Sequence, residues 1–240
     1  MSFPATHISL IRRARSGDAD IRARAQDALA AVYWAPIYAH VRLSHHQEPA
    51  DAEDLTQGFF VDALRRDLFA RYEPGRARFR TFVRTCVDSY VSNALQAERR
   101  QKRGGGATIL PLDVVDVEDR LTIEDAAEHD PDVVFHREWA RSVFVTALAR
   151  LRERYEESER QLHLTLFDRY DIQASEQDRP TYAQLAAEYG IAPTQVTNWL
   201  AATRRDFRAI VLETIRDLSG SDEEFRDEAK ALLGWREEHG

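Results

Sequence analysis

Cysteine, methionine, glycine and proline are all scarce in this sequence. Its 240 residues include one cysteine, one methionine, ten glycines and eight prolines. A single thiol, Cys86, excludes a disulfide framework and a cysteine-rich zinc site. Glycine and proline mark the turns of all-β folds, and few stretches alternate with the period of two that strands need. The scarcity of glycine and proline, together with the lack of alternating stretches, predicts a helical chain.

Long apolar runs are also missing. The longest, Ala28 to Val41, is interrupted by Pro36 and His40 and is too short to cross a bilayer. The segment Met1 to Asp20 lacks the apolar core of a secretory signal. Hydrophobic residues still make up 43% of the chain, enough to build the core of one or two domains. We expect a soluble, cytoplasmic protein.

Charge is distributed unevenly along the chain, although its net value is −8. Arg71 to Arg103 contains nine basic and three acidic residues, a balance of +6. Gly104 to Glu138 contains ten acidic residues and two arginines, a balance of −8. This order predicts a surface that binds a polyanion, beside an element that limits indiscriminate binding.

Apolar residues recur at helical spacing over most of the chain. Tyr72 to Arg78 contains Pro74-Gly75 and is predicted as a loop, and Gly104 to Asp130 as a linker. The fold class is therefore all-α, with two helical domains joined by an acidic linker. Helices are predicted over Ile21–Val41 with Pro36 at a helix start or kink, Pro49–Leu64, Phe79–Arg103, Pro131–Leu151, Leu162–Tyr170, Thr181–Tyr189, Pro193–Ile215 and Asp222–Leu233.

The inward faces of two of these helices follow from their spacing. Thr56 is expected on the outer surface of its helix. On the helix predicted over Pro49–Leu64 the inward residues are Leu55, Phe59, Ala63 and Leu64. On the helix predicted over Phe79–Arg103 they are Phe79, Phe82, Val83, Cys86, Tyr90 and Leu95.

The segment Thr181 to Arg205 has the spacing of a helix-turn-helix. Ala186 allows two helices to approach, and Gly190 permits the positive φ of a tight turn. The inward stripe of the second helix is Val196, Trp199, Leu200, Thr203 and Phe207, and the outward stripe is Thr194, Asn198, Ala201 and Arg205. Asn and Arg suit contacts in a major groove, although an ordinary helical hairpin with a solvated face has the same pattern.

Three motifs occur together in a characteristic order: DAEDLTQGFF from Asp51, FRTFVRTCVDSYVSNALQAERRQKR from Phe79, and YAQLAAEYGIAPTQVTNWLAATRR from Tyr182. Over Leu29 to Arg208 the chain thereby resembles an RNA polymerase sigma factor of the extracytoplasmic-function type. The resemblance implies a second-domain-like unit at 1–103, a linker at 104–130, a fourth-domain-like unit at 131–218 and an acidic extension at 219–240.

The resemblance also implies partners and contact residues. The partners are core RNA polymerase, through its β′ clamp helices and β flap, and promoter DNA. The loop Tyr72 to Arg78 matches the place where the family captures a flipped base of the minus-10 element. The polymerase contacts are Asp51, Glu53, Asp54 and Gln57, and the DNA contacts are Arg76, Arg78, Arg80, Arg84, Arg99, Arg100, Lys102, Arg103, Thr194, Gln195, Asn198, Arg204 and Arg205.

The chain departs from the family at three positions of the minus-10 segment. Phe82 replaces the usual Trp, Ser89 the usual Asn and Asn93 the usual Asp. The base preference is therefore not carried over. Phe79 and Phe82 are expected in the core, while the arginines between them are expected to contact DNA.

Ser219 to Gly240 lies beyond the matching region. Either it caps the helix-turn-helix or it docks a regulator, and an anti-sigma factor is the regulator that the resemblance implies. Two other functions fit part of the pattern: a conventional helix-turn-helix regulator that acts without polymerase, and a protein-interaction adaptor with a sigma-like fold.

An enzyme is not expected, since no Ser-His-Asp or Cys-His pairing stands out. No cofactor or metal is expected either. His40, His45, His46 and Glu48 are interpreted as polar residues of a surface loop.

Overall fold

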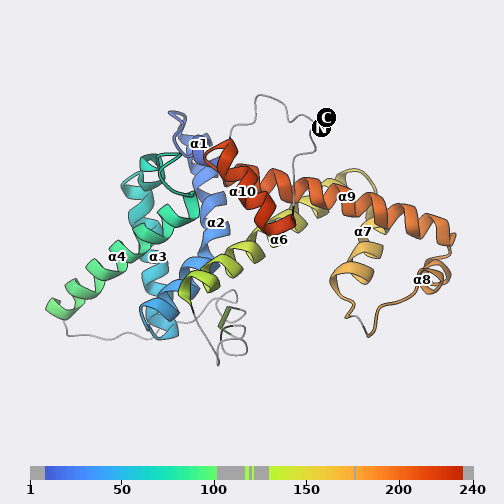
Figure 1. Cartoon of the computed structure of the whole chain (residues 1–240), viewed down its shortest axis with the longest axis horizontal. Coiled ribbons are helices and arrows are strands. Elements are labelled where there is room, and N and C mark those ends of the chain that lie inside the picture. Colours follow the sequence, from blue (N-terminus) through green and yellow to red (C-terminus); the bar gives the residue numbers. More distant parts are fainter. Residues whose placement is uncertain (1–8, 102–116, 119–120, 122–129, 176, 235–240) are drawn as a thin grey trace. The chain divides into compact units, whose positions relative to one another are not determined.

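The protein is described here from a computed structural model. It describes residues 9–101, 117–118, 121, 130–175 and 177–234, with the backbone alone for 98–101. Within these residues every regular element is a helix, so the all-α prediction is confirmed (Figure 1). No helix in this part of the chain is long and apolar enough to span a membrane.

The described residues form two compact units. Unit 1 comprises those of Met1–Val143 together with Ile215–Gly240, and unit 2 comprises Phe144–Thr214. The division falls inside two long helices, α6 (Pro131–Glu157) and α9 (Pro193–Asp217). The functional domains expected at 1–103, 104–130, 131–218 and 219–240 stay predictions.

Unit 1 begins with helices that the sequence encodes by clear end signals. The Asp18 carboxylate caps α2, accepting from the backbone N–H groups of Asp20 and Ile21. Pro49 occupies the first turn of α3, where a missing N–H costs nothing. Pro36 lies within α2 and is buried, so the alternative that it starts a helix is wrong. The bounds in this part are α1 Leu10–Arg13, α2 Ala19–Ser44, α3 Pro49–Arg65, η1 Leu68–Arg71 and α4 Phe79–Gln101.

The core of unit 1 centres on Phe79, the first residue of α4. Its fully buried ring lies 5.0 Å from the ring of Tyr72, 5.6 Å from that of Tyr33 and 6.0 Å from that of Phe69. Edge-to-face and tilted aromatic pairs at these distances stabilise a core beyond their buried area. The start of α4 is thus anchored, and the residues around it are fixed with it.

The buried seams of α3 and α4 differ in detail from the predicted stripes. On α3 the seam is Ala52, Thr56, Phe59 and Ala63, on α4 it is Phe79, Val83, Val87 and Val91. Thr56 is therefore buried and not on the surface, with its hydroxyl donating to the Ala52 carbonyl at 2.7 Å. Leu64 is 38% exposed, so its assignment to the inward face was wrong. Phe82, Cys86 and Tyr90 flank the α4 seam and are half-buried.

The C-terminal helix α10 (Asp222–Leu233) belongs to unit 1. The Ser221 hydroxyl caps it, and Phe225 and Ala229 are buried. Glu224 contacts Tyr72 and Phe79, near the start of α4 (Figure 1). The extension therefore packs within the unit that contains α4, and the idea that it caps the helix-turn-helix is not supported.

Unit 2 contains the rest of α6, α7 (Gln161–Phe167), the π-helical turn η2 (Asp168–Ile172), α8 (Tyr182–Tyr189) and most of α9. Buried residues of α6 recur every fourth position through Ala147, Leu151 and Tyr155. Leu185 of α8 and Leu200 of α9 are buried in the same unit. The predicted helices 181–189 and 193–215 are confirmed to within two residues.

Candidate nucleic-acid interface

The loop from Tyr72 to Arg78 borders a pocket of about 250 Å³ in unit 1. Its lining combines two aromatic rings, two guanidinium groups, one carboxylate and two small side chains. Tyr72 is held in place, because its one hydroxyl proton is shared between the Ala77 carbonyl and Glu224, each 2.9 Å from the hydroxyl oxygen. The complete lining is Arg71, Tyr72, Glu73, Arg76, Ala77, Phe82 and Thr85.

Tyr72 is 1% exposed and Phe82 is half-buried, so the accessible aromatic face of the pocket is that of Phe82. An aromatic face beside arginines suits a flat, electron-rich ligand. Arg76 can turn toward such a ligand, since its side chain is 79% exposed and pairs with the exposed carboxylate of Glu73. An exposed ion pair of this kind contributes little stability. The pocket thus has the chemistry to hold an unstacked base.

Three predicted DNA contacts of unit 1 are already paired within the protein. Arg78 Nη2 lies 3.1 Å from Asp227 Oδ2, and Arg80 Nε lies 2.8 Å from Glu228 Oε1. Both carboxylates belong to α10. Arg84 forms an ion pair with Asp132 in the first turn of α6.

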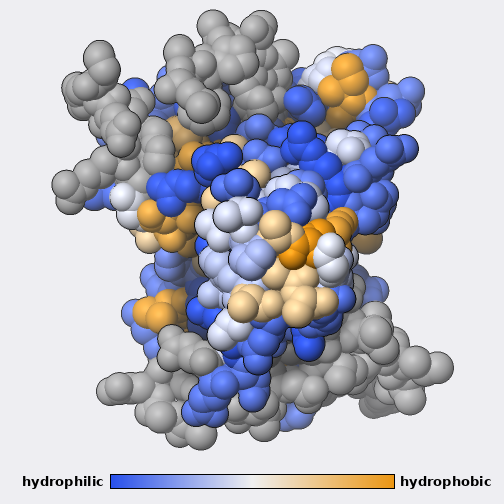
Figure 2. All heavy atoms as spheres, turned by 90° about the vertical axis from the view of Figure 1, so that its right-hand side faces the viewer, coloured by the Kyte–Doolittle hydropathy of each residue, from blue (hydrophilic) through white to orange (hydrophobic). Residues whose placement is uncertain are grey.

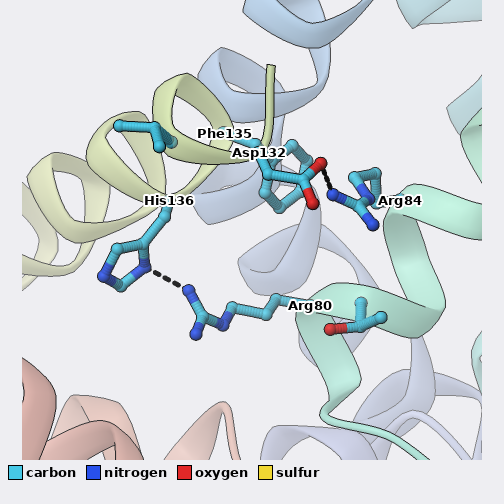
Figure 3. Close-up of a pocket in the computed structure, with 7 residues that line it drawn as sticks. Arg80, Arg84, Asp132, Phe135 and His136 are labelled. Atoms are coloured by element: carbon cyan, nitrogen blue, oxygen red, sulfur yellow. Dashed lines mark hydrogen bonds and ion pairs between the residues drawn. The ribbon is translucent and has the colours of Figure 1, made fainter. Parts of the chain in front are cut away.

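Arg80 and Arg84 also line a second pocket, of about 320 Å³, between α4 and α6 in unit 1. Figure 3 shows the Arg80 guanidinium directed at the imidazole of His136 and the Arg84 guanidinium directed at Asp132. The Arg80 guanidinium also lies 5.3 Å from the ring centre of Trp139. These contacts place Arg80 among three partners, Glu228, His136 and Trp139, and leave its side chain 15% exposed.

Burial and neighbouring charges shift the pKa values of two partners of Arg80, His136 and Glu228. Burial, followed by the charges of Arg80 and Arg78, lowers the pKa of His136, so the imidazole is neutral near pH 7 and accepts from Arg80. Burial raises the pKa of Glu228, although the two arginines oppose that shift. A carboxylate that is 2% exposed is stable only beside such cations.

The residues expected to bind polymerase lie on the first half of α3. Asp51, Asp54 and Gln57 are exposed. Glu53 is 1% exposed, accepts from the Gln57 amide at 2.8 Å and has its pKa raised by burial. The structure therefore presents three of the four for direct contact and places Glu53 beneath them.

The basic end of α4 extends beyond what the structure describes in full. Arg99 and Arg100 lie in the last turns of the helix, and their side chains are outside the described residues. Lys102 and Arg103 lie outside them altogether.

A turn between α8 and α9 gives unit 2 the geometry of a helix-turn-helix. Gly190 ends α8 with φ +66°, a conformation that favours glycine. Thr181 starts α8 with a reciprocal capping box to Gln184. Ala186 and Val196 are buried on the two sides of the turn, as the spacing predicts.

The exposed side of α9 carries the predicted recognition residues. Thr194, Asn198 and Arg205 are exposed, whereas Val196, Leu200 and Thr203 are buried. Figure 2 faces the side that lies to the right in Figure 1, with α8 and the start of α9, and shows a group of hydrophobic side chains surrounded by hydrophilic ones. Trp199 and Phe207 of the predicted inward stripe and Ala201 of the predicted outward stripe are half-buried, so the two predicted faces are confirmed in part.

Two other residues predicted to bind DNA have structural partners on this helix. Gln195 accepts from the Ala192 backbone N–H at 2.9 Å and so caps α9. Arg204 makes two hydrogen bonds of 2.9 Å to Asp171, and its guanidinium lies 5.3 Å from the Tyr170 ring centre. The cap holds the Gln195 side chain at the start of α9, and the bonds to Asp171 direct Arg204 toward η2.

The histidines near the end of α2 are not a surface loop, so that interpretation was wrong for His40. His40 lies inside α2 and is 4% exposed, because its imidazole packs 5.8 Å from the ring of Phe135. Its Nε2 lies 2.7 Å from Asp88 Oδ1, and His45 Nε2 lies 3.0 Å from the same oxygen. These three side chains form the one group in the described part of the chain whose spacing fits a metal ion.

The same three residues have a simpler role as a hydrogen-bonded link between α2 and α4. Burial raises the pKa of Asp88, but the hydrogen bonds from both histidines outweigh it and lower the net value. Ser44 lies 2.9 Å from the other nitrogen of His40 and fixes the ring. A carboxylate shared by two imidazoles needs no ion to be satisfied.

Sequence reasoning missed the acidic partners of the arginines. Asp132 lies in the acidic segment and Asp227 and Glu228 lie in the amphipathic helix 222–233, but neither spacing nor composition pairs them with residues of α4. Opposite charge between a basic segment and an acidic C-terminal helix was the one available signal.

Comparisons with known proteins identify no relative. No protein-family model matches this chain, and no curated protein and no solved structure is detectably similar to it. The site must therefore be interpreted from its own residues.

Proposed function

We propose that this protein is a sigma factor, which binds core RNA polymerase and directs it to promoters. The observation that carries the proposal is the helix-turn-helix of unit 2. Its turn glycine has the required positive φ, and Thr194, Asn198 and Arg205 occupy one exposed side of the second helix. A major groove admits such a helix, and Asn and Arg are suited to read adenine and guanine edges.

The pocket at Tyr72 to Arg78 favours a sigma factor over a conventional regulator. A regulator of duplex DNA has no need to hold an unstacked base, whereas opening a promoter requires a surface that prefers the unpaired strand. Phe82 offers the accessible aromatic face of this pocket, whose lining also includes Arg71 and Arg76, whereas the Tyr72 ring lies buried behind it. Stacking and neutralisation of phosphates offset the loss of base pairing.

In this proposal the exposed start of α3 binds the polymerase. Asp51, Asp54 and Gln57 contact the β′ clamp helices, and the buried Glu53 orients Gln57 through their hydrogen bond. The docking residues differ from those that bind DNA, so the two activities are separable by mutation.

Binding to core polymerase tests the proposal. Asp54→Ala with Gln57→Ala is expected to weaken the complex at least tenfold, since two polar contacts of about 1 kcal/mol each are removed. Glu223→Ala, an exposed acid of α10, is the matched control and keeps wild-type affinity. A conventional regulator binds duplex DNA but not polymerase, and an adaptor binds neither; either result overturns the proposal.

A further inference from the structure

The N-terminus of α4 is occupied by a carboxylate of α10. Glu224 Oε1 accepts from the Phe79 backbone N–H at 2.5 Å, and Oε2 accepts from the Tyr72 hydroxyl at 2.9 Å and the Gly220 N–H at 2.7 Å. The first N–H groups of a helix have no partner within it and carry partial positive charge. Glu224 therefore sits where a phosphate is also stabilised.

The next turn of α10 extends this contact over the neighbouring arginines. Glu228 lies 2.8 Å from Arg80 and 3.6 Å from Arg78, and Asp227 lies 3.1 Å from Arg78. Glu224 and Glu228 are 7% and 2% exposed. Three acids of one helix thus cover the start of α4 and two basic side chains beside it, Arg78 just before the helix and Arg80 in its first turn.

From these contacts we infer that α10 and an unpaired nucleic-acid strand compete for one surface, the start of α4 with Arg78 and Arg80. A carboxylate and a phosphate make the same charge-assisted bonds to guanidinium and backbone N–H groups. Both cannot occupy them at once. The structure is therefore a closed form, and binding of the strand requires α10 to leave. The identity of the ligand rests on the proposed function; the masking of the surface does not.

Competition within one chain explains why the basic segment need not bind nucleic acid indiscriminately. The carboxylates of α10 are present at a high effective concentration, because a short connection joins α10 to α9. A ligand succeeds only if its differential affinity for the open form exceeds the free energy of docking α10. A melted DNA strand held by polymerase is such a ligand, because it binds only the open form.

Gly220 makes the docked position sensitive to a single methyl group. A Cβ at this residue would overlap the ring of Tyr72, and Tyr72 is 1% exposed and held by two hydrogen bonds. Since the ring has no room to retreat, Gly220→Ala is expected to loosen α10 without altering any charge.

The test is binding of a fluorescein-labelled, mixed-sequence single-stranded DNA 15-mer to the full-length chain, followed by anisotropy. Asp227→Asn with Glu228→Gln, and separately Gly220→Ala, should bind about 5- to 100-fold more tightly than wild type. For each arginine that α10 no longer covers, the slope of log K for DNA binding against log salt concentration should become more negative by about 0.7. Glu223→Gln removes one charge from the exposed side of α10 and should behave as wild type.

Hydrogen exchange of wild-type protein keeps the inference testable if a variant folds poorly. Saturating oligonucleotide should speed the exchange of amides 222–233, since α10 is displaced. Binding with undiminished protection of α10, or equal affinity of the wild type and both folded variants, overturns the inference. Polymerase binding measured on the same proteins separates the two proposals. If the wild type does not bind polymerase, only the sigma function is removed. If the α10 variants bind DNA with wild-type affinity, only the competition is removed.

Discussion

Glu224 accepts a hydrogen bond from the backbone N–H of Phe79, a residue 145 positions earlier in the chain. This contact joins the C-terminal helix to the first turn of α4. It also links the aromatic core around Phe79 to the surface that carries Arg78 and Arg80. Stability and access to that surface are therefore coupled in unit 1.

Replacing Glu224 should destabilise the protein. Glu224→Ala leaves the Phe79 and Gly220 N–H groups without their acceptor, whereas the Tyr72 hydroxyl keeps the Ala77 carbonyl. Because buried donors that lose a partner cost about 1–3 kcal/mol each, we expect a loss of roughly 3 kcal/mol in the free energy of unfolding. Urea denaturation measures it, with Glu223→Ala as a control that changes stability by less than about 0.5 kcal/mol. Equal stability of the two variants would contradict the role given to Glu224.

The turn of the helix-turn-helix should be equally specific. Gly190 has φ +66° and no atom within 4 Å of an added Cβ, so Gly190→Ala suffers backbone strain alone. The expected loss is about 1–2 kcal/mol. Gly17 also has open space around it but no positive φ, and Gly17→Ala is the matched control. If thermal denaturation finds the two substitutions equivalent, the turn does not depend on its left-handed residue.

Two adjacent arginines of α9 should give opposite results. Arg205 is exposed, so Arg205→Ala should leave the melting temperature unchanged and cost about 1–3 kcal/mol of binding to a promoter with a minus-35 element. Arg204 is bound to Asp171, so Arg204→Ala should lower the melting temperature. Asn198→Ala should behave like Arg205→Ala. Discrimination between wild-type and altered minus-35 elements that survives both Asn198→Ala and Arg205→Ala would disprove the recognition face.

Acid should destabilise the protein below the ordinary pKa of histidine. Burial lowers the pKa of His40, although Asp88 opposes the shift, and burial together with Arg80 lowers the pKa of His136. Between these lowered values and about 6.5, the unfolded chain binds more protons than the folded one. The free energy of unfolding therefore rises with pH in this range and is fully restored above it.

Urea denaturation at about pH 7.5 and pH 5.5, on either side of the ordinary histidine value, measures this slope. His136→Gln keeps an acceptor for Arg80 but does not titrate, so it should reduce the slope. His46→Gln, at an exposed position, should not. Equal slopes for His136→Gln and the wild type would contradict the assignment of His136.

Local signals made most of the helices predictable. Pro49 at the start of α3, the Thr181 to Gln184 capping box and Gly190 after α8 each act within a few residues. The turn and the two faces of α9 follow from the same short-range spacing. Here the physics that fixes the structure lies within one or two helical turns of the residues concerned.

The pairing of the arginines was not predictable in this way. Arg78 pairs with Asp227 and Arg80 with Glu228 across about 150 positions of sequence. Helical periodicity does not predict such contacts. His40 was misjudged for a related reason, because a polar residue in a helix is buried only when a distant partner, here Asp88, satisfies it. Long-range polar contacts depend on the tertiary fold.

Run-off transcription with bacterial core polymerase on a genomic fragment library tests the proposed function most directly. We predict new start sites that depend on this protein and share spaced minus-35 and minus-10 elements. We also predict that Asp227→Asn with Glu228→Gln increases their yield, while Asp54→Ala with Gln57→Ala abolishes it. The absence of any new start site with both the wild type and the α10 variant, in the presence of folded protein and active polymerase, would contradict the sigma-factor proposal.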